Sequence, residues 1–363
     1  MINRLWALAN KHSKYLPVIF FTLGFLWDVM TLGRIDRLYD RIILCTHLSL
    51  LTVALYLYNI SGDGELKNFY MEKYKGFLPL AIQFFLGGLF SAFVIYFSRS
   101  ISMTKSMLFF IILVFLLFAN ELLKDRISNK YLQFSVYFFV NFTFFIFFVP
   151  LVTKSISTFM FLISGVISLS TSFALFSYIY RKSPSTRDEV HYGKLFSLVI
   201  GIYITINTFY FLNFIPPVPL ALDTAIVAHD VKKVKDEYII TYDRSPWYKF
   251  WRRNNESFIQ QPGSNIYVFT SIFSPTDFKK SVMHRWKWFN PNTNQWQIMD
   301  EITYDITGGR DAGFRGYTYK SNMVEGRWEV NVLTLDGMVL GVIGFTVSQD
   351  NTVASSNLVT VVL

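Results

Sequence analysis

Two tryptophans at alternating positions are the first residues that could form a ligand site. In a strand, Trp286 and Trp288 lie on one face together with His284, while Arg285 and Lys287 lie on the other face. Large aromatic rings with a polar N–H group either fill a core or form an exposed platform for a sugar ring. The sequence leaves both alternatives open for the two tryptophans.

A glycine-rich segment, residues 308–316, is a second candidate site. It holds Arg310, Asp311 and Arg315 among its glycines. Backbone N–H groups and guanidinium groups together can bind an anion, although the same glycines can equally serve a turn or a bulge. The segment differs from a nucleotide-binding phosphate loop because a strand-like sequence follows it rather than a helix.

An aromatic and basic cluster comes shortly after the middle of the chain. It consists of Trp247, Trp251, Arg252 and Arg253. Tryptophan and arginine at this density suit the head-group level of a membrane leaflet. The alternative is a packing loop with a solvated charged end.

A charged cluster near the N-terminus interrupts and follows an apolar stretch. Asp28 lies inside the stretch, and Arg34, Asp36 and Arg37 follow it closely. Charged residues at membrane depth are costly and mark candidate functional sites. The cluster is therefore either a charged interfacial loop that orients two helices, or an ion, proton or head-group site at the outer membrane surface.

Motifs of catalysis and metal binding are missing from the sequence. It contains no G-x-S-x-G, H-E-x-x-H or paired-cysteine pattern. The histidines of the C-terminal half, His229 and His284, lack the spacing of a metal site. We therefore expect no catalytic residue, no metal and no cofactor, and enzymatic activity is the less favoured hypothesis.

The elements that position these residues divide the chain into two halves. Hydrophobic residues make up 52% of the 363 residues and charged residues only 16%, which excludes a disordered chain and an ordinary cytosolic domain. Seven apolar stretches approach the roughly 20 residues that a helix needs to cross a bilayer. They are residues 16–32, 42–60, 77–97, 106–123, 131–152, 158–180 and 195–215.

The net charge of +9 is a signal of topology. All of it falls in residues 1–215, with 19 Lys+Arg against 10 Asp+Glu, while residues 216–363 hold 15 of each. This distribution excludes a nucleic-acid-binding patch, because the exposed half is neutral. Short loops on the side of the N-terminus carry 13 Lys and Arg, and those on the other side carry 6. The positive-inside rule then predicts a cytoplasmic N-terminus and, after seven spans, an extracytoplasmic C-terminal half.

After the prolines at 216–219, the pattern changes to an alternation of period two that is typical of strands. A hairpin loop is predicted at Asn290–Asn294 and a tight turn at Asp336–Gly337. The predicted fold class is a polytopic α-helical membrane domain at 1–215, a proline-rich linker at 216–222, and an all-β immunoglobulin-like or jelly-roll sandwich at 223–363. The expected strands are Thr224–His229, Glu237–Tyr242, Asn265–Phe273, Ser281–Phe289, Trp296–Ile306, Gly316–Lys320, Trp328–Leu335 and Met338–Val347.

Three segments of the sequence are informative when they are taken together and in order. They are Gly24–Asp36, Phe211–Leu220, and the stretch from His284 through Gly308–Ser321 to Gly326–Val347. This combination resembles the bacterial membrane-protein family DUF2914. The resemblance covers both halves and implies a bacterial inner-membrane setting with a C-terminal β domain. Because the family has no assigned function, the resemblance brings no catalytic or binding residue.

Two hypotheses for the function follow. The first is a non-enzymatic sensor or scaffold of the bacterial cytoplasmic membrane, whose periplasmic β-sandwich binds an envelope glycan, a lipid head group or a partner membrane protein. Its candidate contacts are Trp286, Trp288, Arg310 and Arg315. The second is a transporter or enzyme with a polar site at the outer end of the first two helices. Separating the two halves and asking which one keeps activity distinguishes the hypotheses.

Overall fold

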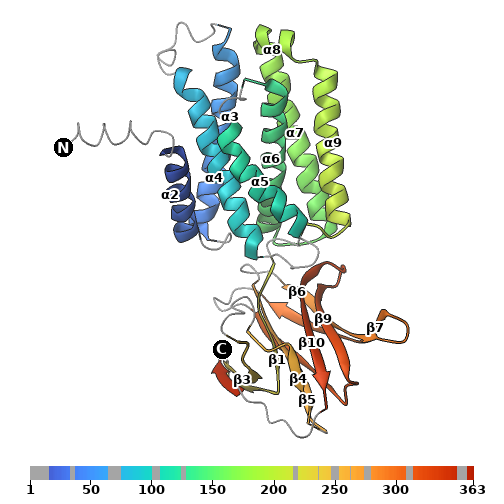
Figure 1. Ribbon diagram of the computed structural model, residues 1–363. Helices are drawn as coiled ribbons and strands as arrows, with labels where there is room; N and C mark the ends of the chain where they lie inside the picture. The colour runs from blue at the N-terminus through green and yellow to red at the C-terminus, as the bar shows by residue number, and fades with distance from the viewer. Residues whose placement is uncertain are drawn as a thin grey trace, which may run out of the picture. The chain divides into compact units, whose positions relative to one another are not determined.

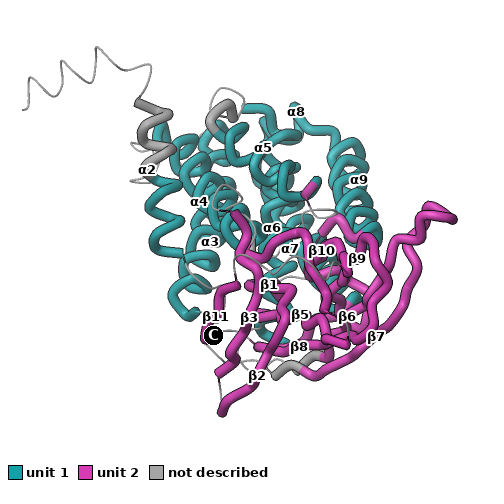
Figure 2. Tube along the Cα trace, turned by 60° about the horizontal axis from the view of Figure 1, so that its bottom comes forward, with its two compact units in different colours: residues 1–98, 108–153, 158–212 teal, residues 99–107, 154–157, 213–363 magenta. Residues whose placement is uncertain are grey.

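The computed structural model places helices and strands in two compact units (Figure 1). Figure 2 shows the division: unit 1 comprises residues 1–98, 108–153 and 158–212, and unit 2 comprises residues 99–107, 154–157 and 213–363. The predicted boundary at Pro216–Pro219 lies outside the described residues. The structure describes residues 16–32, 37–63, 75–99, 107–123, 128–215, 220–235, 237–246, 253–261, 263–273, 279–307, 314–349 and 358–363.

Unit 1 is helical, and each of the seven predicted apolar stretches overlaps one of its helices. Among the described residues, five helices are long and apolar enough to cross a membrane: α3, α4, α6, α7 and α9. Helix α5 has a shorter apolar run, Met107–Asn120, and α2 has 16 residues. The bounds are α2 Leu16–Thr31, α3 Leu38–Ser61, α4 Leu78–Arg99, α5 Met107–Leu123, α6 Lys130–Thr153, α7 Thr158–Lys182, α8 Pro184–Glu189 and α9 Tyr192–Phe211.

Aromatic rings fill the inside of unit 1. Phe97 packs against Phe147 with the ring centroids 4.8 Å apart. A glycine permits close helix packing at one point, because a Cβ atom on Gly165 would lie 2.7 Å from the ring of Tyr203. Other large apolar side chains point outward and are at least 60% exposed, which fits a protein that lies in a bilayer. They include Phe84, Phe115, Phe118 and Phe159.

Unit 2 is β-rich, and its described strands form three sheets. One sheet has the order β1-β5-β8, the second β4-β10-β9-β6-β7, and the third β11-β3-β2. All eight predicted strands overlap observed ones, whereas β2, β4 and β11 were not predicted. The bounds are β1 Ala221–Ala228, β2 Asp230–Val234, β3 Glu237–Asp243, β4 Ser257–Ile259, β5 Asn265–Phe273, β6 Lys279–Asn290, β7 Gln295–Thr307, β8 Phe314–Ser321, β9 Gly326–Thr334, β10 Val339–Ser348 and β11 Leu358–Val362.

The two predicted turns of unit 2 are present. The β6–β7 hairpin turns through residues 291–294 and resumes pairing at Asn290 and Gln295. The β9–β10 connection needs a glycine, because Gly337 has a φ of +80° and donates its backbone N–H to the Thr334 carbonyl. These turns fix which residues of β6, β7, β9 and β10 lie opposite one another.

Candidate functional site

Strand β6 carries two different sets of side chains on its two faces. On the inner face, His284 and Trp286 are fully buried (0% exposed). The Trp286 indole N–H donates to the Thr318 hydroxyl at 3.1 Å, so its polar atom is satisfied inside the core. Trp286 is therefore a core residue, and no sugar ring can reach the face of its indole ring.

The inner face of β6 also holds a polar network around His284. Its Nε2 atom lies 3.1 Å from Thr270 Oγ1 and 3.0 Å from the Tyr304 hydroxyl, and its Nδ1 atom lies 2.9 Å from Thr318 Oγ1. Burial lowers the pKa of His284 to about 3 and raises the pKa of Tyr304. The imidazole is thus neutral at ordinary pH. The network joins β5 and β8 of one sheet to β6 and β7 of another.

Trp288 differs from Trp286 because it is only partly buried. Its indole N–H donates to the Glu325 carbonyl at 3.2 Å. The ring lies against the turn before β9, where a Cβ atom on Gly326 would come within 3.3 Å of the indole nitrogen. Trp288 therefore holds this turn, and part of its ring remains open to solvent.

The outer face of the β6–β7 hairpin bears an exposed apolar and basic patch. Phe289 pairs directly with Trp296 across the hairpin, and their ring centroids are 5.4 Å apart. The Arg327 guanidinium lies over the Phe289 ring at 3.9 Å. Trp296 is 41% exposed and Ile298 57% exposed. We call Phe289, Trp296, Ile298 and Arg327 the arm patch.

The arm patch lies at a sheet edge. In the part of the chain that the structure describes, β7 pairs with β6 and with no other strand. Pairing of β6 with β9 ends at Trp288, while pairing with β7 continues to Asn290. The hairpin therefore reaches past its neighbouring strand, as Figure 1 shows. Every residue from 291 to 300 is exposed.

Charged pairs cover the outer face next to the arm patch. The Arg285 Nε atom donates to Glu301 at 2.5 Å across β6 and β7, and Lys287 pairs with Glu329 at 2.9 Å. These cross-strand pairs leave Arg285 and Lys287 engaged with carboxylates. The arm patch is thus the apolar end of an otherwise charged face.

The remaining predicted site residues of unit 2 fall into two groups. Arg315 lies in β8, opposite Ser271, and is half-buried. Arg253 is exposed, and its carbonyl accepts the backbone N–H of Ser245. Five others lie outside the described residues: Trp247, Trp251, Arg252, Arg310 and Asp311.

In unit 1, Asp28 of α2 lies near polar side chains of two other helices, Ser91 of α4 and His47 of α3. The Ser91 hydroxyl has no hydrogen-bond partner among the described residues. Gly88 of α4 leaves room for this histidine, because a Cβ atom there would lie 2.8 Å from the imidazole ring. His47 and Ser91 were not predicted beside Asp28, since sequence spacing does not relate separate helices. Arg37 is exposed; Arg34 and Asp36 lie outside the described residues.

A second polar cluster in unit 1 joins the end of α3, the start of α6 and helix α8. Ser183 caps α8, and Pro184 follows it at the first helical position. The Asp63 carboxylate accepts hydrogen bonds from the Ser183 hydroxyl (2.5 Å) and the Ser185 backbone N–H (2.8 Å). Buried Lys130 donates to the Ser185 hydroxyl at 3.1 Å.

The same cluster stabilises the ionised form of Asp63. Partial burial opposes ionisation, but the hydrogen bonds from Ser183 and Ser185 and the charge of Lys130 outweigh it. The pKa of Asp63 therefore lies below its ordinary value. The cluster ties three helices together at one end of unit 1.

Metal binding has no candidate within the described residues: no group of three or more His, Cys, Asp or Glu side chains is arranged to hold an ion. Sequence reasoning did not single out Trp296, which is exposed and lies in the edge strand β7. The tryptophans that it proposed as contacts were Trp286, Trp288, Trp247 and Trp251, and the last two lie outside the described residues. The predicted hairpin loop at 290–294 was the signal that could have found it, because that loop places Trp296 opposite Phe289.

Comparison with solved structures gives similarities of low TM-score. An immunoglobulin-like protein from Pseudomonas aeruginosa is 11% identical, with 36% of this chain and 98% of that chain covered and a TM-score of 0.21. A β-glucosidase from Kluyveromyces marxianus is 12% identical, with 35% and 14% covered and a TM-score of 0.17. A Pseudomonas fluorescens alkylpurine DNA glycosylase is 10% identical, with 87% and 99% covered and a TM-score of 0.21. These scores are too low to carry an argument about fold or function.

Comparison with protein families is more informative. No curated protein matches the chain. Residues 279–347, which run from the start of β6 almost to the end of β10, match the family model described as "Protein of unknown function (DUF2914)". The arm patch and the His284 network, apart from Thr270, lie within the matched residues. The match confirms the predicted resemblance to DUF2914 for this part of the β unit. The match does not extend to Gly24–Asp36 or Phe211–Leu220, the other two segments that the sequence analysis compared.

Proposed function

We propose that this protein is a non-enzymatic, membrane-anchored binding protein whose β unit engages a partner protein of the bacterial envelope. The arm patch is the observation that carries the proposal. An exposed Trp and Ile beside a partly buried Phe and an exposed Arg match the aromatic and arginine enrichment of protein-binding hot spots. The free edge of β7 adds backbone groups that a partner strand can pair with.

The anchoring part of the proposal rests on the helices of unit 1. We propose seven spans, with α2 and α5 completing the five longer helices, and an immunoglobulin-like or jelly-roll sandwich for unit 2. The excess of Lys and Arg in loops on the side of the N-terminus supports a cytoplasmic N-terminus. With seven spans, the protein is anchored in the bacterial inner membrane and unit 2 lies on its periplasmic side. A reporter that is active only in the cytoplasm, fused after Leu363, is expected to stay inactive; activity there contradicts this topology.

The binding part is tested by isolating the protein from native membranes with its partners. The tagged wild-type chain is expected to retain one envelope protein at a fixed ratio. Trp296→Ala together with Ile298→Ala is expected to lose that protein while keeping the same thermal midpoint, because both side chains are exposed. Tyr319→Ala is the matched control, since Tyr319 is a 54% exposed aromatic residue of β8 outside the arm patch. Equal recovery with all variants contradicts the proposal.

The surroundings of Asp28 favour a second candidate function, transport or chemistry within the membrane. A carboxylate beside His47 and Ser91 could exchange protons or bind a cation. In proteoliposomes, this candidate predicts a proton or cation flux that Asp28→Asn abolishes. A flux that is absent from the wild-type protein contradicts it.

A further inference from the structure

One end of unit 1 presents a group of exposed basic side chains. Helix α8 links the end of α7 to the start of α9 there, as Figure 1 shows. Residues 181–194, from the last turn of α7 into the first turn of α9, contain four Lys and Arg against two Asp and Glu. All four basic residues are exposed: Arg181, Lys182, Arg187 and Lys194. We call these four residues the basic turn.

The backbone that carries the basic turn is held in place. The Ser183 hydroxyl accepts the backbone N–H of Thr186 at the start of α8, and buried Lys130 of α6 donates to the Thr186 hydroxyl at 3.0 Å. Val190, at the end of α8, is only 1% exposed. Because this backbone is already ordered, the basic side chains give up less conformational entropy when a ligand binds than they would on a flexible loop.

Carboxylates of the same region are partly engaged by other groups. Asp63 is bonded to the serines that begin α8, and Glu189 lies 3.5 Å from Lys130 Nζ. Asp188 is the other acidic residue of the segment and is exposed. Since Lys130 offsets part of this negative charge and is not counted in the basic turn, positive charge remains in excess at the surface of residues 181–194.

Tyrosine side chains surround the same end of the helices. The Tyr192 hydroxyl lies 2.7 Å from Ser177 Oγ, and the Tyr192 ring packs against Tyr180 of α7 with the centroids 5.3 Å apart. The Tyr131 hydroxyl accepts the backbone N–H of His191 at 2.7 Å. Tyrosines are enriched where the apolar core of a bilayer meets its head groups. In a membrane-anchored protein, the basic turn is therefore expected at the depth of the lipid phosphates.

Charge and depth together define the ligand class. Guanidinium and ammonium groups bind phosphate oxygens through charge-assisted hydrogen bonds. Basic residues next to a membrane attract anionic lipids, by roughly fivefold in affinity per Lys or Arg. We propose that the basic turn binds the head groups of anionic phospholipids, whose charge is not offset by a cationic group as it is in phosphatidylcholine. This inference rests on the proposed membrane anchoring and is independent of partner binding by the arm patch.

The test measures which lipid the full-length protein retains. The protein is reconstituted into vesicles that contain equal amounts of phosphatidylglycerol and phosphatidylcholine with the same acyl chains, and is then extracted and purified in a neutral detergent. Mass spectrometry quantifies the lipid that stays bound. The wild type is expected to retain phosphatidylglycerol with at least about tenfold preference. A wash at high salt is expected to reduce the preference, because salt screens exposed charges.

Three variants separate the charge of the basic turn from charge elsewhere. Gln at all four positions is expected to bring the ratio of the two retained lipids close to one. A variant that exchanges Arg and Lys at the same positions keeps the charges and is expected to keep the preference. The matched control, expected to behave like the wild type, replaces four exposed basic residues of unit 2 with Gln: Lys232, Lys233, Lys235 and Arg244. All three variants are expected to keep the thermal midpoint of the wild type, because the substituted side chains are exposed.

The proposal is overturned if the wild type retains both lipids equally, or if the control variant loses the preference as the basic-turn variant does. It is also overturned if inorganic phosphate in the wash displaces phosphatidylglycerol while chloride at equal ionic strength does not, since the site then binds free phosphate. Failure of the anchoring gives a different result. A protein that does not co-float with vesicles contradicts the membrane assignment, whereas one that enters phosphatidylcholine vesicles and shows no preference contradicts only lipid recognition by the basic turn.

Discussion

Acid is expected to destabilise the β unit through one residue, His284. In the folded protein the pKa of His284 is lowered to about 3 by burial, while an exposed histidine in the unfolded chain has a pKa of about 6.5. Below pH 6.5 the unfolded chain therefore binds a proton that the folded chain does not. Stability contributed by the neutral imidazole is complete above pH 6.5 and is lost as the pH falls toward 3.

The size of the effect follows from the difference between the two pKa values. Each pH unit below 6.5 lowers the free energy of unfolding by about 1.4 kcal/mol. The total loss is about 2 kcal/mol at pH 5 and about 5 kcal/mol near pH 3. Typical domains are stable by only about 5–15 kcal/mol. The acid dependence of this one group is thus large enough to measure.

The assay compares the wild type with His284→Gln by urea unfolding of the full chain in detergent at pH 7.5 and pH 5. Tryptophan fluorescence reports mainly on the β unit, since six of the eight tryptophans lie after residue 216. The variant is expected to be less stable at pH 7.5, because partners of His284 lose hydrogen bonds. Between pH 7.5 and pH 5, its free energy of unfolding is expected to fall by about 2 kcal/mol less than that of the wild type. The reasoning is refuted if His284→Gln loses as much stability on acidification as the wild type does.

Two further predictions concern unit 1, and thermal or denaturant unfolding in detergent checks both. Asp63→Ala is expected to lower the free energy of unfolding by about 1–2 kcal/mol, because it removes the acceptor of several hydrogen bonds. Glu189→Gln is the control: its side chain is 55% exposed, so the loss is expected to be under about 1 kcal/mol. Equal losses in the two variants contradict this account. Gly165→Leu is expected to cost about 1–3 kcal/mol, because a side chain there collides with Tyr203. Gly201→Leu, where a Cβ atom meets nothing within 4 Å, is the control, and an unchanged Gly165→Leu variant contradicts the packing described.

Local pattern predicted most elements of the fold but not those that depend on distant partners. The strand Asp230–Val234 has the sequence DVKKV, which carries too much charge to suggest a strand. It exists because it pairs with β3. Leu358–Val362 pairs with the same β3 from more than a hundred residues away. A pairing between segments so far apart cannot be predicted from the alternation of residues within a short stretch of sequence.

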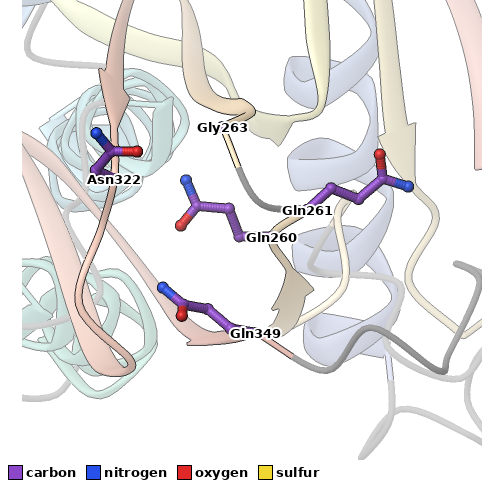
Figure 3. A pocket seen from close by; sticks show the side chains of 5 residues that line it. All are labelled: Gln260, Gln261, Gly263, Asn322 and Gln349. Atoms are coloured by element: carbon purple, nitrogen blue, oxygen red, sulfur yellow. The ribbon is translucent and has the colours of Figure 1, made fainter.

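The candidate sites show the same limit. Alternation along β6 correctly grouped His284, Trp286 and Trp288 on one face, but it did not show which face a second sheet would cover. That depends on packing of β5 and β8 against β6, through residues such as Thr318. The small polar pocket of unit 2 (Figure 3) is harder still to predict, because its lining residues Gln260, Asn322 and Gln349 come from three separate segments without any common motif.

Photo-crosslinking from the arm patch in living cells tests the central claim most directly. A crosslinking amino acid replaces Trp296 in one variant of the full-length protein. In a second variant, the control, it replaces Tyr319. The account predicts one discrete adduct with an envelope protein from position 296, lost when Ile298→Ala is added, and no such adduct from position 319. The absence of an adduct at 296, or the same adducts from both positions, contradicts partner binding through the arm patch.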